Sequence, residues 1–375
     1  MGAGVHGAAV AYHLAARGVR PVIFERTRPA GGPTGRSSAV CRAYYTNPFL
    51  ARAARESIDM FADWERVVGG DAGFRRTGAL FLHGQEDEEQ VREAVGRLTA
   101  IGTACDLLEP DAIAERFPHF DLSGVALGVW ERDAGYADPA GTTDALFRGA
   151  MARGAEARLG TTIERIDPDA GWGGTLVDAT GTATRCRRVL IAAGPWTRGL
   201  AAQAGADLPL TVERHVVAMF RWGEAPRVPT HADIPNGYYL RPEGADLFLV
   251  GPLHEEPQAD PDAFDERLGE DESRQLGDAV VRRTPALEAA QPDGGWASLY
   301  DVSPDWQPVI GEIAPGIFVD AGTSGHGFKL APGLGRHIAA LIMGDEVPGI
   351  EAFHPNRFEQ AHALTAGYGD ARILG

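Results

Sequence analysis

The stretch Gly2-Ala3-Gly4-Val5-His6-Gly7 leads into an alanine-rich segment, the apolar run 22–24 and then Glu25. Glycines in this spacing let the chain turn sharply, let its backbone approach a pyrophosphate, and let a helix pack close to a sheet. The N-terminus of that helix offers free N–H groups and a partial positive charge to the anion. Glu25 follows at the distance from which an acid accepts hydrogen bonds from a ribose. The stretch therefore predicts a dinucleotide site, against the alternative of a ligand-free glycine turn.

One part of this pattern is missing. A first parallel strand of about five apolar residues should precede Gly2, but only Met1 stands there. We expect a start upstream of Met1, or a shortened chain, as the explanation. The alternative is a chain that has lost its cofactor.

Length and composition narrow the class of protein. A chain of 375 residues is too long for one compact core and predicts two domains. Its net charge of −17 disfavours nucleic acid as a partner. The longest apolar run, around residues 189–193, is far too short to span a membrane. The few cysteines lie far apart and no His/Cys/Asp cluster has metal-ligand spacing, which predicts a cytoplasmic protein without a metal site.

The pattern of elements predicts an α/β (α+β) fold built from interleaved parts. A strand ending near Gly194 and another ending near residue 321 both run into glycine turns, and the second turn, 322–329, leads to a helix expected over 332–343. Strand-rich stretches interrupt these Rossmann-type parts. We assign residues 1–72, 135–205 and 293–375 to a dinucleotide-binding domain, and residues 73–134 and 206–292 to an antiparallel β-sheet substrate domain.

These stretches, in this order, carry a resemblance. The chain resembles the D-amino-acid oxidase superfamily of FAD enzymes, and within it the sarcosine oxidase and glycine oxidase-like group. The stretches that carry the likeness are Gly2–Gly7 with Glu25, Gly35-Arg-Ser-Ser38 with Arg42, Ala192-Ala-Gly-Pro-Trp196, Leu299–Trp306, and Ser324-Gly-His-Gly-Phe-Lys329. The resemblance implies a Rossmann-type FAD-binding domain interleaved with the substrate domain.

The resemblance also implies a reaction. FAD would accept a hydride at N5 from the carbon next to an amine, and the imine would hydrolyse. The partners would be an amine or amino-acid substrate and O2 or another electron acceptor. Two positions depart from the pattern. Ser298 stands where relatives attach FAD through cysteine, which implies non-covalent FAD. The run Leu247–Leu253 has no lysine to promote oxygen reduction, so a dehydrogenase remains open beside an oxidase.

Four residues are candidates for substrate contact or catalysis. Arg42 could hold a substrate carboxylate in bidentate fashion, or form a surface ion pair. Lys329 could be a second cation for that carboxylate or for the flavin. Tyr300 could bond the carboxylate, or be a packed core tyrosine. His254 roughly matches an active-site histidine of sarcosine oxidases, whereas we interpret His215 as structural.

A second set is predicted to contact the cofactor, with His326 contacting the flavin through its backbone rather than acting in catalysis. The set comprises Gly2, Gly4, Gly7, Glu25, Arg26, Ser37, Ser38, Ile163, Gly194, Trp196, Gly325, His326, Gly327, Phe328 and Lys329.

The sequence thus predicts FAD-dependent oxidation of a small amino acid or of a secondary or N-methyl amine, and an N-methyl, secondary or cyclic amino acid is favoured over a D-amino acid. The alternatives are a tailoring oxidase or dehydrogenase for a larger amine metabolite, and a catalytically impaired flavoprotein-like chain.

Overall fold

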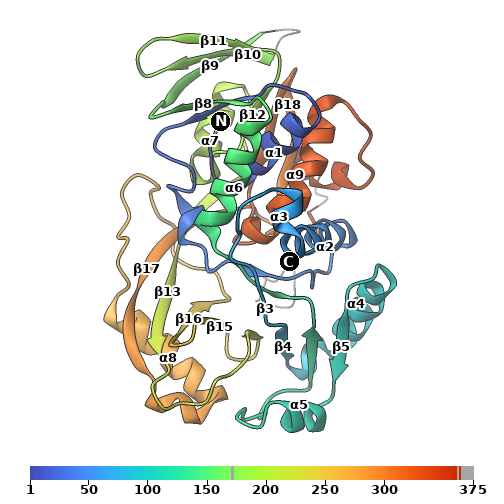
Figure 1. Ribbon diagram of the computed structural model, residues 1–375, viewed down its shortest axis with the longest axis vertical. Helices are drawn as coiled ribbons and strands as arrows, with labels where there is room; N and C mark the ends of the chain where they lie inside the picture. Colours follow the sequence, from blue (N-terminus) through green and yellow to red (C-terminus); the bar gives the residue numbers. More distant parts are fainter. Residues whose placement is uncertain (170–172, 361–362, 365–375) are drawn as a thin grey trace.

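The computed structural model describes residues 1–169, 173–360 and 363–364. The assigned segments 170–172, 361–362 and 365–375 of the dinucleotide-binding domain lie outside the described residues. Figure 1 shows α1, α6 and α9 in the upper half of the molecule, and β13, β17, β4 and β5 in the lower half. The helices are α1 (Val5–Ala16), α2 (Pro48–Ala62), α3 (Trp64–Val67), α4 (Glu88–Ala100), α5 (Pro110–Arg116), α6 (Pro139–Ala152), α7 (Thr197–Gln203), α8 (Glu270–Arg283) and α9 (Gly327–Met343).

The upper half contains short parallel strands beneath packed helices. Strand β1 pairs in parallel with β8, and β12 pairs in parallel with β19, whose other neighbour, β18, is antiparallel. Helix α1 packs between α6 and α9, and its small alanines allow the close approach. The bounds of these strands are β1 (Val22–Glu25), β8 (Glu156–Leu159), β12 (Val189–Ile191), β18 (Val309–Ala314) and β19 (Ile317–Ala321).

Met1 occupies the place between β1 and β12 where a first strand was expected. Its amino group donates to Leu190 O at 2.6 Å, and Ala192 N donates to Met1 O at 3.0 Å. On the other side, Gly2 N donates to Phe24 O at 2.9 Å. Two residues therefore connect β1 with β12, and the glycine turn begins directly at this connection.

The lower half is one eight-stranded sheet in the order β17-β13-β16-β15-β14-β4-β6-β5. Strands of both predicted insertions join in it, together with β17. The strands are β4 (Ala79–His83), β5 (Cys105–Leu108), β6 (Leu127–Glu131), β13 (Thr211–Arg221), β14 (His231–Asp233), β15 (Tyr238–Glu243), β16 (Leu247–Pro252) and β17 (Gln291–Val302). All neighbours are antiparallel except β14 and β4, which belong to different insertions and are not constrained by a hairpin.

Two smaller sheets complete the described chain. One is the meander β11-β10-β9, at the top of Figure 1. The other, in the order β2-β7-β3, lies where the chain passes between the halves, and Arg42 follows its first strand. Their strands are β9 (Ile163–Asp169), β10 (Gly173–Asp178), β11 (Ala183–Cys186), β2 (Val40–Cys41), β7 (Gly135–Tyr136) and β3 (Arg75–Arg76). The predicted fold class, Rossmann-type parts interleaved with a largely antiparallel sheet, is confirmed.

Helix α9 begins earlier than the sequence predicted. It starts at Gly327, and Pro332 lies inside it. Ser57 of α2 supports this proline, because its hydroxyl donates to Leu330 O at 3.1 Å and accepts from Gly333 N at 2.9 Å. The second glycine turn is therefore the start of the helix itself, and Lys329 lies in its first turn.

Candidate active site

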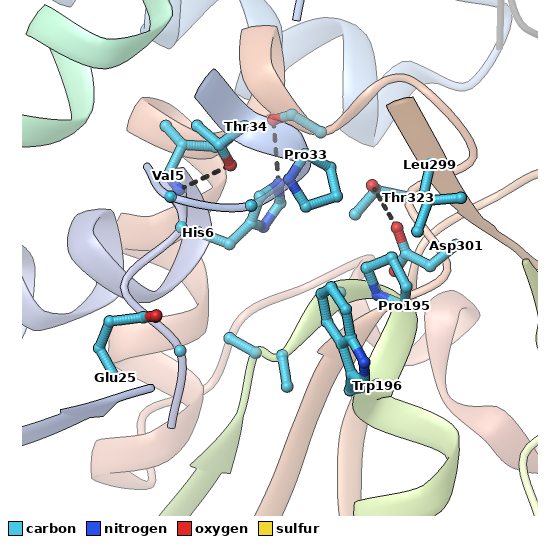
Figure 2. Close-up of a pocket in the computed structure, with 18 of the residues that line it drawn as sticks. Val5, His6, Glu25, Pro33, Thr34, Pro195, Trp196, Leu299, Asp301 and Thr323 are labelled. Atoms are coloured by element: carbon cyan, nitrogen blue, oxygen red, sulfur yellow. Dashed lines mark hydrogen bonds between the residues drawn. The ribbon is translucent and has the colours of Figure 1, made fainter. Parts of the chain in front are cut away.

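A cavity of about 500 Å³ lies between the first glycine turn and the start of α9. Its walls include Gly2 and Gly4 from one turn and Gly325 and Gly327 from the other, so the structure brings the two turns together. The volume is in the range of cofactor and ligand sites. Figure 2 shows the labelled side chains around this space, with Glu25 at one side and Trp196 at another.

The first turn depends on glycine for two different reasons. Gly2 has a φ of +94°, and a Cβ there would lie 2.2 Å from Ala192 O. A Cβ on Gly7 would lie 2.0 Å from Gly2 O. Gly4 has an ordinary φ of −66°, and a Cβ would meet only Thr34 Oγ1, at 3.1 Å. Gly2 and Gly7 therefore build the turn, whereas Gly4 keeps space free for a ligand.

Glu25 is held at the edge of the cavity by protein donors. Its Oε2 accepts from Ala3 N at 2.9 Å, and its Oε1 accepts from Thr27 N at 2.8 Å. Oε1 also accepts from the Thr27 hydroxyl at 2.9 Å, so Oε2 is the oxygen that can accept a further bond from a ribose hydroxyl. Arg26, predicted to bind the cofactor, places its guanidinium 3.7 Å from the centre of the Trp196 ring, and the two form a wall of the cavity.

The second turn is shaped by residues of β17. Gly325 has a φ of +80°, and a Cβ there would lie 2.5 Å from the Tyr300 ring. The Asp301 carboxylate accepts from Gly322 N at 2.6 Å and from Thr323 Oγ1 at 3.3 Å. Burial raises the pKa of Asp301. This support of the turn by Asp301 could not be read from the sequence.

A smaller cavity of about 60 Å³ adjoins the larger one. The two share lining residues, namely Ser37, Ser38, Tyr300, Gly325 and Phe328. Arg42 and Lys329 line only the smaller one, with apolar side chains such as Phe81 and Leu253. Three of the four predicted substrate residues, Arg42, Tyr300 and Lys329, therefore meet in one place.

Both cations of the smaller cavity are buried. The Arg42 side chain donates to Tyr44 O, and its guanidinium lies 4.5 Å from the centre of the Tyr45 ring. Lys329 has no hydrogen-bond or ion-pair partner within the described chain. Burial and the nearby Arg42 hold the pKa of Lys329 well below its usual range. An anion bound between the two side chains would offset both the burial of Lys329 and its repulsion by Arg42.

Glu131 is a part of the site that the sequence analysis missed. It ends β6, is fully buried, and accepts from Ala43 N at 2.7 Å and from Tyr44 N at 3.0 Å. It therefore fixes the backbone that follows Arg42. Burial raises the pKa of Glu131 to about 7, against the opposing effects of these N–H groups and Arg42. A glutamate ending an apolar strand was the available signal.

This pKa predicts a pH-dependent stability. Between the unfolded value of 4.5 and about 7, the folded chain binds the proton of Glu131 more tightly. The free energy of unfolding should thus fall as pH rises through this window, by up to about 3 kcal/mol. Glu131→Gln should remove this loss. Urea unfolding at about pH 5 and about pH 8 measures it, with the exposed Glu115→Gln as control. Equal pH dependence in all three proteins would contradict it.

The remaining histidines fall into different places. His254 lies outside both cavities, is 59% exposed, and pairs with Glu256 at 3.2 Å, so the structure does not bring it to Arg42. His326 is fully buried and outside the residues lining either cavity. His215, interpreted as structural, lines the larger cavity and stacks on Tyr300 with ring centres 3.9 Å apart.

The other predicted cofactor residues can be placed directly. Those lining the larger cavity are Gly2, Gly4, Glu25, Arg26, Ser37, Ser38, Ile163, Gly194, Trp196, Gly325, Gly327 and Phe328, whereas Gly7, His326 and Lys329 do not line it. Ser298 also lines it, and none of the cysteines does. The described residues hold no group of three or more His, Cys, Asp or Glu side chains that could bind a metal.

Comparison with known proteins agrees with this geometry. The model of the family of FAD-dependent oxidoreductases (DAO) matches residues 1–341. The chain is 28% identical to 4-methylaminobutanoate oxidase (formaldehyde-forming) of Paenarthrobacter nicotinovorans, over 94% of this chain and 44% of that protein. It is 25% identical to monomeric sarcosine oxidase of Streptomyces avermitilis, over 97% and 98%. The chain thus spans less than half of the first relative and nearly all of the second.

Solved structures show the same fold. L-proline dehydrogenase from P. horikoshii has a TM-score of 0.86 at 24% identity, covering 97% of each chain. Glycine oxidase from Geobacillus kaustophilus has a TM-score of 0.80 at 24% identity, covering 95% and 97%. The two glycine turns, the free space at Gly4 and the position of Glu25 fit FAD. The resemblance to the sarcosine and glycine oxidase group is confirmed, and the chain belongs to the DAO family of FAD-dependent oxidoreductases.

Proposed function

We propose that this chain oxidises the carbon–nitrogen bond of a small amino acid with a secondary or N-methyl amine, using FAD. The observation that carries the proposal is the small cavity in which Arg42 and Lys329 lie beside a wall shared with the FAD cavity. A carboxylate bound there would hold the neighbouring carbon close to the cofactor.

The charge of the small cavity favours an anionic group and a neutral amine. Its described lining includes two basic side chains, Arg42 and Lys329, and no acidic side chain. Arg42 can bind a carboxylate through two parallel N–H bonds. Without a carboxylate to stabilise an ammonium group, the amine is held uncharged, which is the form that can release a hydride from its neighbouring carbon.

The size of the cavity favours a small substrate. A volume of about 60 Å³ holds roughly four to six atoms of the size of a water molecule. Glycine and sarcosine are small enough for this volume, whereas a long amine is not. This observation disfavours the alternative of a large amine metabolite.

The protein would contribute binding, orientation and the exclusion of water. FAD, when bound, supplies an acceptor for a hydride from the carbon next to the amine. Arg42 and Tyr300 would orient the carboxylate, and Phe81 and Leu253 would keep water from the reacting carbon. Release of the imine then allows water to convert it to a carbonyl product and an amine.

Attachment of FAD and the electron acceptor complete the proposal. FAD would be non-covalent with respect to cysteine, because Ser298 lines the cavity and Cys41, Cys105 and Cys186 do not. Strand β16 carries no lysine that could promote the reduction of O2. The electron acceptor is therefore either O2 or another compound.

No helix in the described part is long and apolar enough to cross a membrane. The free cysteines are the basis for inferring a cytoplasmic location.

Anaerobic loss of the flavin absorbance tests the proposal. Sarcosine should bleach the FAD-loaded protein, and 4-methylaminobutanoate, with its longer chain, should do so at least about tenfold more slowly at equal concentration. Preference for the longer amine would favour the larger-substrate alternative. A protein that binds FAD but is bleached by neither compound, nor by glycine, proline or D-alanine, would overturn the substrate class. A protein that binds no FAD would favour the impaired chain.

A further inference from the structure

His6 joins the two glycine turns through both of its ring nitrogens. Its Nδ1 lies 2.8 Å from Asp320 Oδ2, and its Nε2 lies 2.9 Å from Gly327 O. A carboxylate and a carbonyl oxygen can only accept hydrogen bonds, so both contacts are satisfied only when both nitrogens carry a proton. The geometry therefore calls for a positively charged imidazolium between the first turn and the start of α9. His6 is labelled in Figure 2 and lines the larger cavity.

The surroundings of His6 favour that charge. Burial alone would lower the pKa of His6, but Asp320 on β19, the carbonyl of Gly327 on α9, and Asp301 on β17 together raise it above its ordinary value. Asp320 and Asp301 are the titratable groups that act on His6 within the described chain. The histidine is thus held between three elements that form the end of the FAD cavity.

The second carboxylate oxygen of Asp320 has no partner among the described residues. Asp320 lies near the carboxyl end of β19, the end of a parallel strand at which cofactors bind in such folds. Asp320 is one of the residues that line the larger cavity, and its side chain is buried. Its Oδ1 accepts no hydrogen bond within the described chain. A buried carboxylate oxygen without a donor is costly, so a hydroxyl group of a ligand in the cavity would satisfy it.

We propose that His6 and Asp320 form a buried ion pair, called the clasp below, that holds the two glycine turns together at the end of the FAD cavity. We also propose that Asp320 Oδ1 accepts a hydrogen bond from a hydroxyl of bound FAD. The clasp rests on the family's cofactor and not on the identity of the substrate. Loss of the imidazolium proton would break one of its two bonds and separate the turns that line the cavity. FAD affinity should therefore weaken as pH rises above the range in which His6 is protonated.

The test is the dissociation constant of FAD, measured by flavin fluorescence on the protein freed of cofactor, from about pH 6 to about pH 9. His6→Leu and Asp320→Asn should each weaken binding at least about tenfold at the low end of this range and flatten its pH dependence. Because both changes remove one clasp, the double variant should be weakened less than the product of the two single effects.

His13→Leu is the matched control. His13 lies on the same helix, and its Nε2 also bonds a carbonyl of α9, that of Pro332 at 2.8 Å, but it does not line the FAD cavity. Its loss should leave the FAD affinity and its pH dependence as in the unmodified protein. An equal change in the His13 variant would show that the loss of any bond between α1 and α9 accounts for the effect, which would overturn the clasp.

The contact to the FAD hydroxyl has its own comparison. The clasp is already absent in the single variant His6→Leu. The further loss of FAD affinity in the double variant His6→Leu with Asp320→Ala therefore measures the hydrogen bond that Asp320 Oδ1 accepts from FAD. An additional weakening of several-fold is expected, and none would overturn that contact. If the variants fail to fold, the unmodified protein still decides, because an FAD affinity that does not change with pH contradicts the clasp. Failure to bind FAD under any condition would instead contradict the cofactor assignment.

Discussion

Replacing Gly4 by valine is expected to weaken FAD binding at least about 100-fold, or about 2.8 kcal/mol, while the chain still folds. Gly4 has φ −66° and ψ 176°, a conformation that valine adopts readily. A Cβ there meets only the hydroxyl of Thr34, at 3.1 Å. The added methyl groups would instead extend into the cavity where the backbone must approach the pyrophosphate. The substitution should therefore change the stability of the fold little and the affinity for FAD strongly.

FAD titration and a thermal unfolding curve measured without FAD separate the two effects. Gly96→Val is the matched control, because Gly96 lies in the exposed part of α4 and a Cβ there meets nothing within 4 Å. The control should bind FAD as the unmodified chain does. An FAD affinity for Gly4→Val within about threefold of that of the control would show that the pyrophosphate does not lie at this turn.

Replacing Arg42 by methionine is expected to lower kcat/KM for a small amino acid by about 10³-fold, with the FAD content unchanged. Arg42 is 3% exposed and lines the substrate cavity but not the larger one. Methionine keeps much of the packing against Tyr45 and Phe81 but removes the planar donors for the carboxylate. Loss of a buried charged hydrogen-bonded partner costs several kcal/mol, which corresponds to this factor.

A small carboxylate inhibitor such as acetate measures the same contact without turnover. Its binding should shift the flavin spectrum of the unmodified protein, and the Arg42 variant should require at least about a hundredfold more of it. Arg52→Met, on the exposed face of α2, is the control and should behave as the unmodified chain. Unchanged acetate binding in the Arg42 variant would place the carboxylate elsewhere.

Glycines of the two turns could be singled out from the sequence, because the backbone itself requires that residue there. Gly2, Gly7 and Gly325 stand where a Cβ would collide with neighbouring atoms, so the structure can hold only glycine there. A pattern of such residues is visible without knowing their partners. Lys329 was singled out because a lysine in a glycine turn at a helix N-terminus is unusual in itself, and Arg42 because a guanidinium suits a carboxylate. Their contact with substrate stays a prediction.

Residues that act across the fold could not be found in this way. Glu131 bonds to residues 43 and 44, and His6 bonds to Asp320, more than 300 positions away. A single sequence does not show such pairs. His254 was predicted near the substrate, but its side chain is exposed and pairs with Glu256. Its place after a strand indicates where the residue lies along the chain, but not which way its side chain points. The start of α9 was misplaced since Ser57, on another helix, supports the proline within it.

The most direct measurement of the central claim is a crystal structure of the FAD-bound protein with a small carboxylate ligand. The account predicts the pyrophosphate at Gly4, a ribityl or ribose hydroxyl of FAD at Asp320 Oδ1, and the carboxylate between Arg42 and Lys329, next to the flavin ring. A flavin ring bound away from the cavity that Arg42 and Lys329 line would contradict it.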